Sequence, residues 1–303
     1  MDPIYEILCG IAGAEAVRTG ELMKKHTTFR IGGPADYMVS PPSAEKAEEV
    51  MGFCRLNEIP CFVLGNGSNL LVSDGGFRGV VLRIRENMSR ITVEGCTLKA
   101  EAGALLSAAA AECCAAGLSG VEFASGIPGT IGAGIAINAG AYGGELKQIL
   151  KDALVIDRSG KKSRLTADDL EMGYRTSRAL REGLIILEAS FILEEGDPED
   201  IRSRMEELNR RRREKQPLEY PSAGSTFKRP AGYFAGKLIQ DAGLSGYRSG
   251  GACVSEKHCG FVVNTGGATA ADVMAVIRHV QDEVFRRTGV ELEPEVRILG
   301  EVS

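Results

Sequence analysis

The sequence predicts an α+β fold in which two strand-and-helix lobes precede a smaller C-terminal domain. Apolar runs of strand length alternate with helical segments between Ala35 and Leu193. The pattern changes at Gly196-Asp197-Pro198, where the aspartate suits an N-cap and the proline suits the first position of a helix. A glycine-rich stretch and an amphipathic helix follow, and a chain of 303 residues is long enough for this division.

Composition indicates a globular protein without a general affinity for polyanions. Hydrophobic residues make up 44% of the chain, charged residues make up 25%, and the formal net charge is −5. No overall field would draw such a chain to nucleic acid or to an anionic membrane. The longest uncharged stretch, 123–144, is long enough to cross a bilayer, but its seven glycines and its proline would leave backbone groups unpaired in lipid. We therefore expect no nucleic acid partner and no membrane insertion.

The N-terminus and the cysteines favour a cytoplasmic protein. Met1-Asp2-Pro3-Ile4-Tyr5-Glu6 lacks the basic and apolar regions of a signal peptide. The eight cysteines contain no CxxC pair and have no regular spacing, so we expect reduced thiols. The three histidines are too scattered to form a zinc site with them, and we predict no metal.

Helices and strands can be placed from periodicity and capping. Strands are predicted at 35–39, 61–64, 80–85, 91–93, 153–157, 184–193, 261–264 and 292–299. Ser43 caps a helix that ends near Asn57, a small-residue helix occupies about 104–116, and Thr269 with Asp272 forms a capping box for a helix that ends at Gly289. Arg210–Arg213 closes the helix that begins at Pro198, either as a solvated last turn or as an anion-steering group.

Two glycine-rich loops, Leu64 to Leu71 and Ser125 to Gly132, are the main functional signal. Neither is a common nucleotide fingerprint, because Leu70 stands where GxGxxG needs its third glycine, and Gly236-Lys237-Leu238 lacks the Walker spacing. Glycine lets backbone N–H groups approach a pyrophosphate, and such concavities bind anions without net positive charge. One loop of this kind is more often a simple turn, but the pair suits a dinucleotide.

The loops and their flanks resemble one enzyme family. In chain order, the resembling segments are 27–33, the two loops, 138–143, 174–177, 216–217, 223–228, 235–239 and 293–297. They are similar to the bacterial MurB enzymes, the UDP-N-acetylenolpyruvoylglucosamine reductases. The chain lacks a long insertion after Arg175, so it resembles the shorter type II form.

The resemblance implies an architecture. Residues 1–195 would form a two-lobed FAD-binding domain of the vanillyl-alcohol oxidase/p-cresol methylhydroxylase type, with lobes at about 20–85 and 86–195. Residues 196–303 would form an α+β substrate-binding domain whose last strand returns to the active site.

The resemblance also implies a reaction. NADPH reduces non-covalently bound FAD, and the flavin then reduces the enolpyruvyl ether of UDP-N-acetylglucosamine enolpyruvate to UDP-N-acetylmuramate. The product is a peptidoglycan precursor used in cell wall biogenesis. The expected partners are these small molecules, and we expect a monomer.

Three residues are implied to be catalytic. Ser225 would be the general acid that protonates the intermediate. Arg175, whose planar fork keeps its charge, would stabilise the developing enolate, and Glu295 would orient or polarise the same carboxylate region. Read alone, these residues would be a backbone cap, a surface arginine and a strand-end carboxylate.

Ligand contacts are implied at more positions. The expected FAD contacts are Gly65, Asn66, Gly67, Ser68, Asn69, Ser125, Gly126, Pro128, Gly129, Thr130, Gly132, Asn138, Gly140 and Ala141. Weaker candidates for the substrate are Tyr142, Tyr174 and Lys228, together with the arginine-rich approach to Gln216.

Two positions depart from the family pattern. Gly132-Ala133-Gly134 replaces Gly-Gly-Ala, so Ala133 would be strained if its φ were positive. Arg229 stands where some relatives have asparagine, and its role is open.

Two alternatives stay open at this point. One is another FAD-dependent oxidase of the same superfamily, although those chains are usually longer and many bind flavin covalently. The other is a flavin-free module that binds a UDP-sugar.

Overall fold

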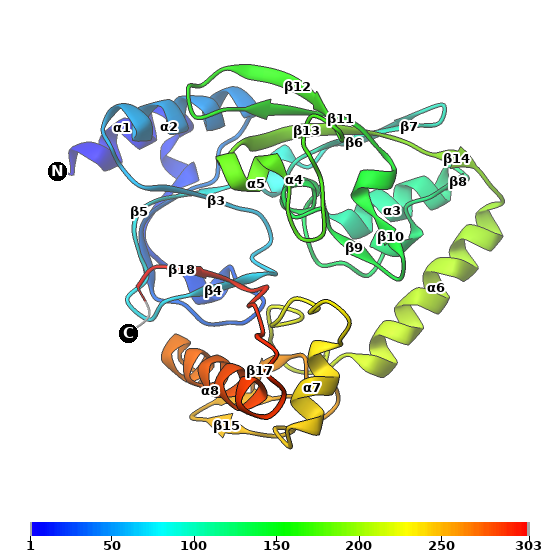
Figure 1. Ribbon diagram of the computed structural model, residues 1–303. Coiled ribbons are helices and arrows are strands. Elements are labelled where there is room, and N and C mark those ends of the chain that lie inside the picture. Colours follow the sequence, from blue (N-terminus) through cyan, green and yellow to red (C-terminus); the bar gives the residue numbers. More distant parts are fainter. Residues whose placement is uncertain (1, 302–303) are drawn as a thin grey trace. The chain divides into compact units, whose positions relative to one another are not determined.

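The computed structural model describes residues 2–301 and shows a mixed helix and strand chain that divides into two compact units (Figure 1). The first unit contains the residues up to Thr19, Tyr37–Asn66 and Gly79–Arg212. The second contains Gly20–Asp36, Gly67–Arg78 and the residues from Arg213 onward. The predicted α+β class is confirmed. The predicted domains, 1–195 and 196–303, are continuous in sequence whereas these units interleave, and that domain division stays a prediction.

The first sheet has four strands in the order β1-β2-β5-β3. They are β1 (Val17–Leu22), β2 (Pro34–Val39), β5 (Phe77–Arg83) and β3 (Cys61–Leu64). Helix α2 (Ala44–Leu56) connects β2 to β3, and the Ser43 side chain accepts the Lys46 N–H at 3.4 Å, as the sequence predicts. Strands β3 and β5 are parallel, with Cys61 opposite Val80. The residues that follow β3 are therefore delivered at the carboxyl end of a parallel pair.

A five-stranded antiparallel sheet is the largest sheet of the first unit, in the order β12-β11-β13-β7-β6 (Figure 1). Its strands are β6 (Ile91–Glu94), β7 (Thr97–Glu101), β11 (Leu150–Ile156), β12 (Lys162–Thr166) and β13 (Ile185–Ile192). Helices α3 (Leu106–Ala115) and α4 (Ile131–Ala136) belong to the same core, where Ala109, Ala110 and Ile135 are fully buried. Small residues on α3 let this helix lie close to its neighbours.

The other elements of the first unit are shorter or lie at its ends. They are α1 (Pro3–Ala12), η1 (Ala14–Ala16), η3 (Glu86–Met88), β8 (Leu118–Ser119), η4 (Glu122–Ala124), β9 (Gly140–Ala141), β10 (Gly144–Glu145), η5 (Leu146–Gln148), α5 (Arg178–Glu182), β14 (Glu194–Glu195) and α6 (Pro198–Lys215), whose residues from Arg213 onward are assigned to the second unit. Helix α6 begins as predicted, with Asp197 accepting the N–H groups of Glu199 and Asp200.

The second unit has a core of its own. Strands β15 (Arg248–Ser249), β16 (Ala252–Val254) and β17 (Val262–Asn264) form an antiparallel sheet, and α7 (Ala235–Asp241) and α8 (Ala270–Thr288) belong to the same unit. The fully buried α8 residues Val276 and Val280 share a core cluster with Phe29 and Leu71 from the two early segments. The remaining elements are η2 (Met23–Lys25), β4 (Leu70–Val72) and β18 (Arg297–Leu299), and β18 pairs in parallel with β4.

Helix α8 confirms its predicted ends, and the last strand is shorter than predicted. The Thr269 hydroxyl and the Asp272 carboxylate form the capping box, and Gly289 adopts the left-handed conformation that ends the helix. A strand was predicted over 292–299, but regular pairing begins only at Arg297. Pro294 has no N–H to donate, and it forms only an isolated bridge with Phe227.

No helix in residues 2–301 is both long enough and apolar enough to cross a membrane. Within the same range, no group of three or more histidine, cysteine or acidic side chains could hold a metal ion. All eight cysteines are free thiols.

Candidate active site

The two glycine-rich loops meet in the first unit. The loop after β3 starts at Gly65, where an added Cβ would lie 2.5 Å from the Thr130 hydroxyl oxygen. Asn66 Nδ2 donates a hydrogen bond of 2.6 Å to the Pro128 carbonyl. Glycine at 65 is therefore needed for the close approach of one loop to the other. The two loops therefore touch, and their joint role in binding a dinucleotide stays a prediction.

Backbone hydrogen bonds hold the second loop against the segment between β7 and α3. Leu106 N–H donates to the Gly129 carbonyl at 3.0 Å, and Ile131 N–H donates to the Ala104 carbonyl at 2.8 Å. The N–H groups of Gly129 and Thr130 donate to no other residue of the described chain, 2–301. Two adjacent amides on a rigid glycine loop suit a phosphate oxygen, so this part of the unit fits the pyrophosphate of FAD.

Ala133 is unstrained, which settles the concern raised by the sequence. It lies in helix α4, whose N-cap Thr130 accepts the Ala133 N–H at 3.4 Å, and it is absent from the residues with positive φ. Its methyl group is exposed. Glycine is instead required at Gly132, where a Cβ would lie 2.9 Å from the Ala102 methyl group.

Helix α6 covers the start of the second loop. Asn209 Nδ2 donates to the Ser125 hydroxyl at 3.2 Å, and a Cβ on Gly126 would lie 3.1 Å from Arg212 Cδ. Burial lowers the pKa of the Arg212 guanidinium, and within residues 2–301 no carboxylate pairs with it. In the sequence the four arginines form one run, in which nothing distinguishes Arg212, and Asn209 was not predicted as a site residue. Their i, i+3 spacing on a helix was the available signal.

Arg175 lies in a tight two-residue turn. Gly173 and Thr176 exchange backbone hydrogen bonds of 3.0 and 3.2 Å, and Arg175 between them has φ of 56°. The buried Asn138 side chain donates to the Gly173 carbonyl at 3.2 Å and accepts the Lys147 N–H at 2.9 Å. Asn138 therefore braces the turn that presents Arg175.

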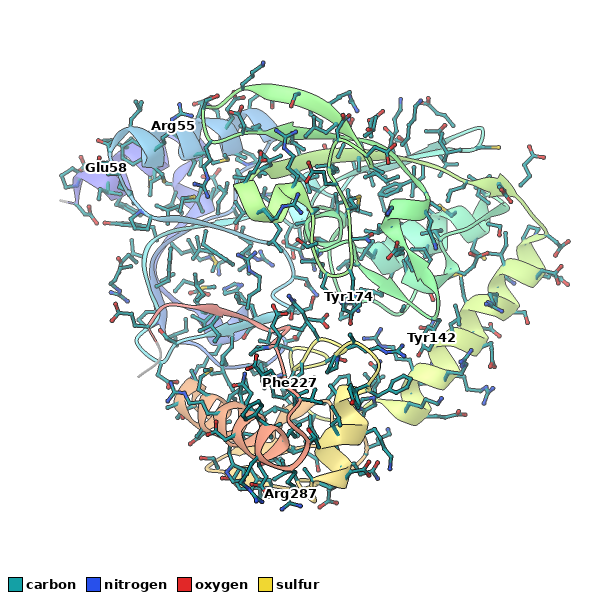
Figure 2. The ribbon with its side chains drawn as sticks, in the orientation of Figure 1. Arg55, Glu58, Tyr142, Tyr174, Phe227 and Arg287 are labelled. Carbon is teal, nitrogen blue, oxygen red and sulfur yellow. The ribbon has the colours of Figure 1, made fainter. Side chains whose placement is uncertain are left out.

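Side-chain contacts further define the surroundings of Arg175. One guanidinium nitrogen donates to the Gly140 carbonyl at 3.4 Å, and the guanidinium carbon lies 5.3 Å from the centre of the Tyr174 ring. Tyr142 lies at the tip of the β9–β10 hairpin, with Arg211 5.1 Å from its ring centre. Tyr142 and Tyr174 are both exposed aromatic residues of this unit (Figure 2). Exposed rings beside a fixed guanidinium form a surface suited to an anionic, planar ligand.

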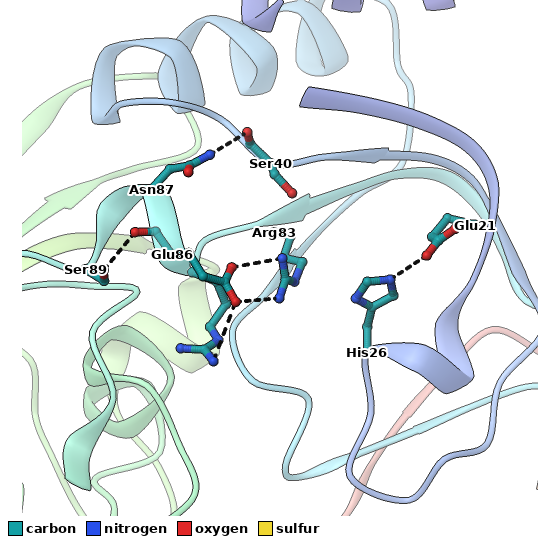
Figure 3. Close-up of polar contacts among 8 residues, drawn as sticks. Glu21, His26, Ser40, Arg83, Glu86, Asn87 and Ser89 are labelled. Atoms are coloured by element: carbon teal, nitrogen blue, oxygen red, sulfur yellow. Dashed lines mark hydrogen bonds and ion pairs between the residues drawn. The ribbon is translucent and has the colours of Figure 1, made fainter. Parts of the chain in front are cut away.

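The rest of the first loop belongs to the second unit. Gly67 has φ of 62°, and any Cβ there would collide with the His26 carbonyl. His26 Nε2 in turn lies 2.8 Å from Glu21 Oε1 (Figure 3). Asn69 Nδ2 donates to the Glu295 carbonyl at 3.2 Å, and the Arg297 N–H donates to the Asn69 carbonyl at the same distance. Asn69 therefore holds the chain on both sides of Val296.

Charged pairs also order the exit of β5 in the first unit. Arg83 pairs with Glu86 at 3.0 Å, and the Ser89 hydroxyl donates to the Glu86 carbonyl at 2.7 Å (Figure 3). The Arg83 guanidinium is thereby paired with a carboxylate three residues along its own chain.

Ser225 and Glu295 lie on paired segments of the second unit. Glu295 N–H donates to the Thr226 carbonyl at 2.8 Å, and Lys228 N–H donates to the Glu293 carbonyl at 2.8 Å. Ser225 is exposed, and its hydroxyl has no hydrogen-bond partner within residues 2–301. The two segments are far apart in sequence, and their pairing brings the predicted acid and carboxylate residues onto neighbouring backbones.

Comparison with known proteins identifies the family. Residues 216–299 match the model described as UDP-N-acetylenolpyruvoylglucosamine reductase, C-terminal domain, and residues 35–166 match an FAD binding domain. A curated UDP-N-acetylenolpyruvoylglucosamine reductase from Lachnoclostridium phytofermentans is 50% identical over 302 residues, covering 98% of this chain and 97% of that protein. The chain belongs to the UDP-N-acetylenolpyruvoylglucosamine reductase family.

Further relatives of this reductase family agree. A curated reductase from Clostridium novyi is 50% identical, covering 99% of this chain and 97% of that protein. The crystal structure of MurB from Thermus caldophilus has a TM-score of 0.81 at 37% identity, covering 94% of this chain and 100% of that one. A solved structure of Phl p 4.0202, a glucose dehydrogenase, has a TM-score of 0.50 at 14% identity over 65% of this chain and 45% of that one, a likeness of fold alone.

The structure gives the predicted site residues of this reductase distinct surroundings. Gly65, Asn66, Pro128 and Thr130 form the contact between the loops. Asn138 and Gly140 contact the Arg175 turn, while Gly67 and Asn69 support their own unit. Ser68 and Ala141 are half-buried. The ligand and catalytic roles of all these residues stay predictions.

Lys228, a predicted substrate contact, and Arg229, which departs from the family pattern, both contact neighbouring side chains or backbone in the second unit. Lys228 Nζ lies 2.5 Å from Glu293 Oε1, which occupies the lysine in an ion pair. Arg229, whose role was open, lies 3.9 Å from the centre of the exposed Phe234 ring and donates to the Tyr233 carbonyl at 3.2 Å. Arg229 therefore orders the loop that leads into α7.

Proposed function

We propose that this chain is an NADPH-dependent flavoenzyme that reduces the enolpyruvyl ether of UDP-N-acetylglucosamine enolpyruvate to UDP-N-acetylmuramate. The observation that carries the proposal is the full-length relationship to reductases of that name, at 50% identity over 98% of the chain. Both the FAD-binding match and the C-terminal family match lie within that length. The product serves peptidoglycan synthesis, and we expect a cytoplasmic monomer that needs no nucleic acid.

The cofactor-holding part of the proposal rests on the first unit. When bound and reduced by NADPH, FAD would supply the hydride that adds to the alkene of the substrate. The amides of Gly129 and Thr130 would hold a phosphate oxygen, and the loop contact through Gly65 and Asn66 would keep those amides in place. Arg212, half-buried against Gly126, would meet an anionic group of the ligand at that loop.

The reduction needs charge stabilisation and a proton. Hydride addition at the terminal alkene carbon moves the π electrons onto the carbon that bears the carboxylate, giving an enolate-like anion. Arg175 would stabilise that charge, because its guanidinium keeps its proton and is held by its turn. The Ser225 hydroxyl would then donate a proton to the same carbon, which completes the saturated ether.

Glu295 and the aromatic residues have supporting roles in the proposal. The Glu295 backbone is held by Thr226 on one side and by Asn69 on the other, which gives its side chain a defined origin. It would orient the carboxylate end of the substrate. The UDP or carboxylate groups would contact Tyr142, Tyr174 and Lys228. To bind the substrate, Lys228 would have to break its ion pair with Glu293 or bind both groups at once.

A half-reaction experiment on Ser225→Ala tests the proposal. NADPH should bleach the flavin of the variant at the wild-type rate, because flavin reduction does not use the serine proton. Reoxidation by UDP-N-acetylglucosamine enolpyruvate should slow by about 10²- to 10⁴-fold, the usual contribution of a general acid. Ser249→Ala in β15 is the matched control and should leave both steps unchanged.

Three results would contradict the proposal. Normal reoxidation of the Ser225→Ala variant would remove Ser225 as the proton donor. Flavin colour that stays with the denatured polypeptide would favour the covalent oxidases of the same superfamily. A folded protein without flavin absorbance and without NADPH oxidation would favour a flavin-free UDP-sugar module.

A further inference from the structure

We propose that His258 is a positioning residue for the proton donor and that it acts on Ser225 through the backbone of Gly260 and Thr226. This inference rests on the proposed role of Ser225. All the contacts that support it lie within the second unit. In the sequence His258 is only one of three scattered histidines that do not form a zinc site.

Thr226, the residue after Ser225, is bonded at three points. Its N–H donates to the Gly260 carbonyl at 2.8 Å, and its hydroxyl accepts the Val262 N–H at 2.9 Å. Its carbonyl accepts the Glu295 N–H at 2.8 Å. Thr226 is buried, so these bonds are shielded from water and fix its backbone. Two of the three bonds come from the segment that follows His258.

The turn from Ser255 to Phe261 holds the Gly260 carbonyl in place. His258 Nδ1 accepts the Gly260 N–H at 3.1 Å, and the His258 carbonyl accepts the Phe261 N–H at 3.0 Å. Ser255 closes the turn, because its hydroxyl accepts the His258 N–H at 3.3 Å and its N–H donates to the Phe261 carbonyl at 2.9 Å. His258 therefore holds Gly260 on both flanks of its Cα: the imidazole accepts the Gly260 N–H, and the His258 carbonyl accepts the Phe261 N–H of the peptide group whose carbonyl binds Thr226.

The His258 ring is locked by packing. It lies edge-on to the Phe261 ring, with 5.0 Å between centroids. An added Cβ on Gly236 or on Gly260 would lie 3.2 or 3.0 Å from His258 Cε1, so the ring fills the space between these two glycines. Burial lowers the pKa of His258, which favours the neutral ring that can accept at Nδ1.

Ser225 itself has few restraints. It is exposed, it follows Gly224 at φ of 79°, and its hydroxyl has no partner within residues 2–301. Its position is therefore set mainly by the neighbouring residue Thr226. A displacement of about 1 Å at a reacting group can cost about 10²-fold in rate. A shift of the Gly260 carbonyl would thus slow proton donation by Ser225 more than it slows flavin reduction.

Substitutions at His258 test this inference. His258→Asn places an amide oxygen near the Nδ1 position and keeps an acceptor for Gly260, whereas His258→Leu keeps much of the volume and removes the acceptor. The Leu variant should reoxidise with the enolpyruvyl substrate about 10- to 100-fold more slowly than wild type, with flavin reduction by NADPH unchanged. The Asn variant should recover to within about 3-fold of wild type in the same step.

Each other outcome overturns the inference. Wild-type reoxidation in the Leu variant would remove His258 from the positioning of Ser225. Equal slowing in the Asn and Leu variants would mean that the shape of the ring matters and not its acceptor. An equal loss in both half-reactions would point to general damage.

If the Leu variant does not retain flavin, His258→Gln, whose amide reaches the Nε2 position, replaces it with the same expected results.

Two further variants distinguish a failure of this inference from a failure of the proposed function. Ser225→Ala measured beside these variants tests the proton donor itself, so normal His258→Leu kinetics with a slow Ser225→Ala variant would reject only the positioning role. His279→Leu is the matched control, because His279 lies on α8 and stacks on Tyr247 at 4.0 Å. It should change neither half-reaction.

Discussion

Asn138, Tyr142 and Arg175 have left-handed backbone conformations, with φ of 47°, 55° and 56°. Such a conformation costs a non-glycine residue about 1–2 kcal/mol, so surrounding structure must hold it. The Asn138 amide and the Gly173–Thr176 turn provide that support around Arg175. Arg30, Glu58 and Glu171 share this conformation, so it marks tight turns in general, and at Arg175 the turn fixes where the guanidinium starts.

Gly65→Ala should weaken FAD binding. The new methyl group would lie 2.5 Å from the Thr130 hydroxyl, so the Thr130 side chain or the loops themselves must shift. Overpacking of this kind costs about 1–3 kcal/mol, which corresponds to a loss of about 5- to 150-fold in affinity if it falls on the bound state. Titration of the FAD-free protein with FAD, followed by flavin fluorescence, measures the change.

Gly52→Ala is the matched control for that substitution. Gly52 lies inside α2, and an added Cβ there meets no atom within 4 Å. Replacing a helical glycine with alanine should stabilise the protein by about 0.5–1 kcal/mol and leave FAD affinity unchanged. An unchanged affinity in Gly65→Ala would show that the loop contact does not support the cofactor.

Residue identity predicted chemistry better than it predicted surroundings. Strain at Ala133 was expected only if its φ were positive, and the amino-acid sequence does not determine that angle. In the structure Ala133 lies in the helix that begins at Ile131, so it is not strained. Asn209 and Arg212 were not singled out, because they contact Ser125 and Gly126, which are far away in sequence. His258 was not singled out either, because its local bond to Gly260 gains meaning only from the packing against Gly236 and the bond from Thr226 to Gly260. Local patterns cannot reveal such contacts until the strands are paired.

At the scale of elements, α8 shows how charge at a helix end stabilises the fold. Glu283 pairs with Arg286 at 2.7 Å and with Arg287 at 2.5 Å. These arginines, Arg286 first and Arg287 second, lower the pKa of Glu283 to about 2. Because the pKa of Glu283 is lower in the folded chain, its two ion pairs stabilise the protein fully at pH values above the ordinary glutamate pKa of 4.5. That stabilisation is lost as the pH falls toward 2.

Glu283→Gln should therefore lower the thermal unfolding midpoint at pH 7 and have less effect at pH 3. The loss at pH 7 should be small, because Arg286 and Arg287 are solvent-accessible. Calorimetry of both proteins at several pH values measures the difference. Glu291→Gln, at an exposed position after the helix, is the control. A difference that grows as the pH falls would contradict the assigned sign.

Elements with local signals were predicted, and elements that depend on distant partners were not. Helices α2, α6 and α8 begin at the predicted caps Ser43, Asp197 and Thr269. Helix α1 was missed although Asp2 and Pro3 repeat the same signal. The last strand is shorter than the predicted 292–299, because its extent depends on pairing with β4 and on Pro294 rather than on apolar alternation.

At the scale of the whole molecule, the second unit draws its core from three parts of the sequence. Phe29, Ile31 and Leu71 come from the early segments and share one cluster with residues of α7 and α8. The family resemblance correctly implied the fold class, but contiguous domain ranges could not anticipate this interleaving. A sequence pattern reports which residues are buried and leaves open which other residues they meet.

Leu71→Ala should therefore destabilise structure far along the chain. Leu71 is fully buried, and truncation of such a leucine costs about 2–5 kcal/mol. Amide hydrogen exchange should speed up in peptides from α8, 270–288, although the substitution lies in β4. Leu56→Ala, at a position that is 79% exposed, is the control. Unchanged exchange in the α8 peptides would contradict a shared core.

The parallel pairing of β18 with β4 has a consequence for how the protein is made. Leu70–Val72 leaves the ribosome more than two hundred residues before Arg297–Leu299, which is its partner. During translation the edge of β4 and the apolar side chain of Leu71 must wait for the last part of the nascent chain. A premature stop codon just before residue 297 would thus leave an early strand without its partner, and such a product is a natural target for cellular proteases.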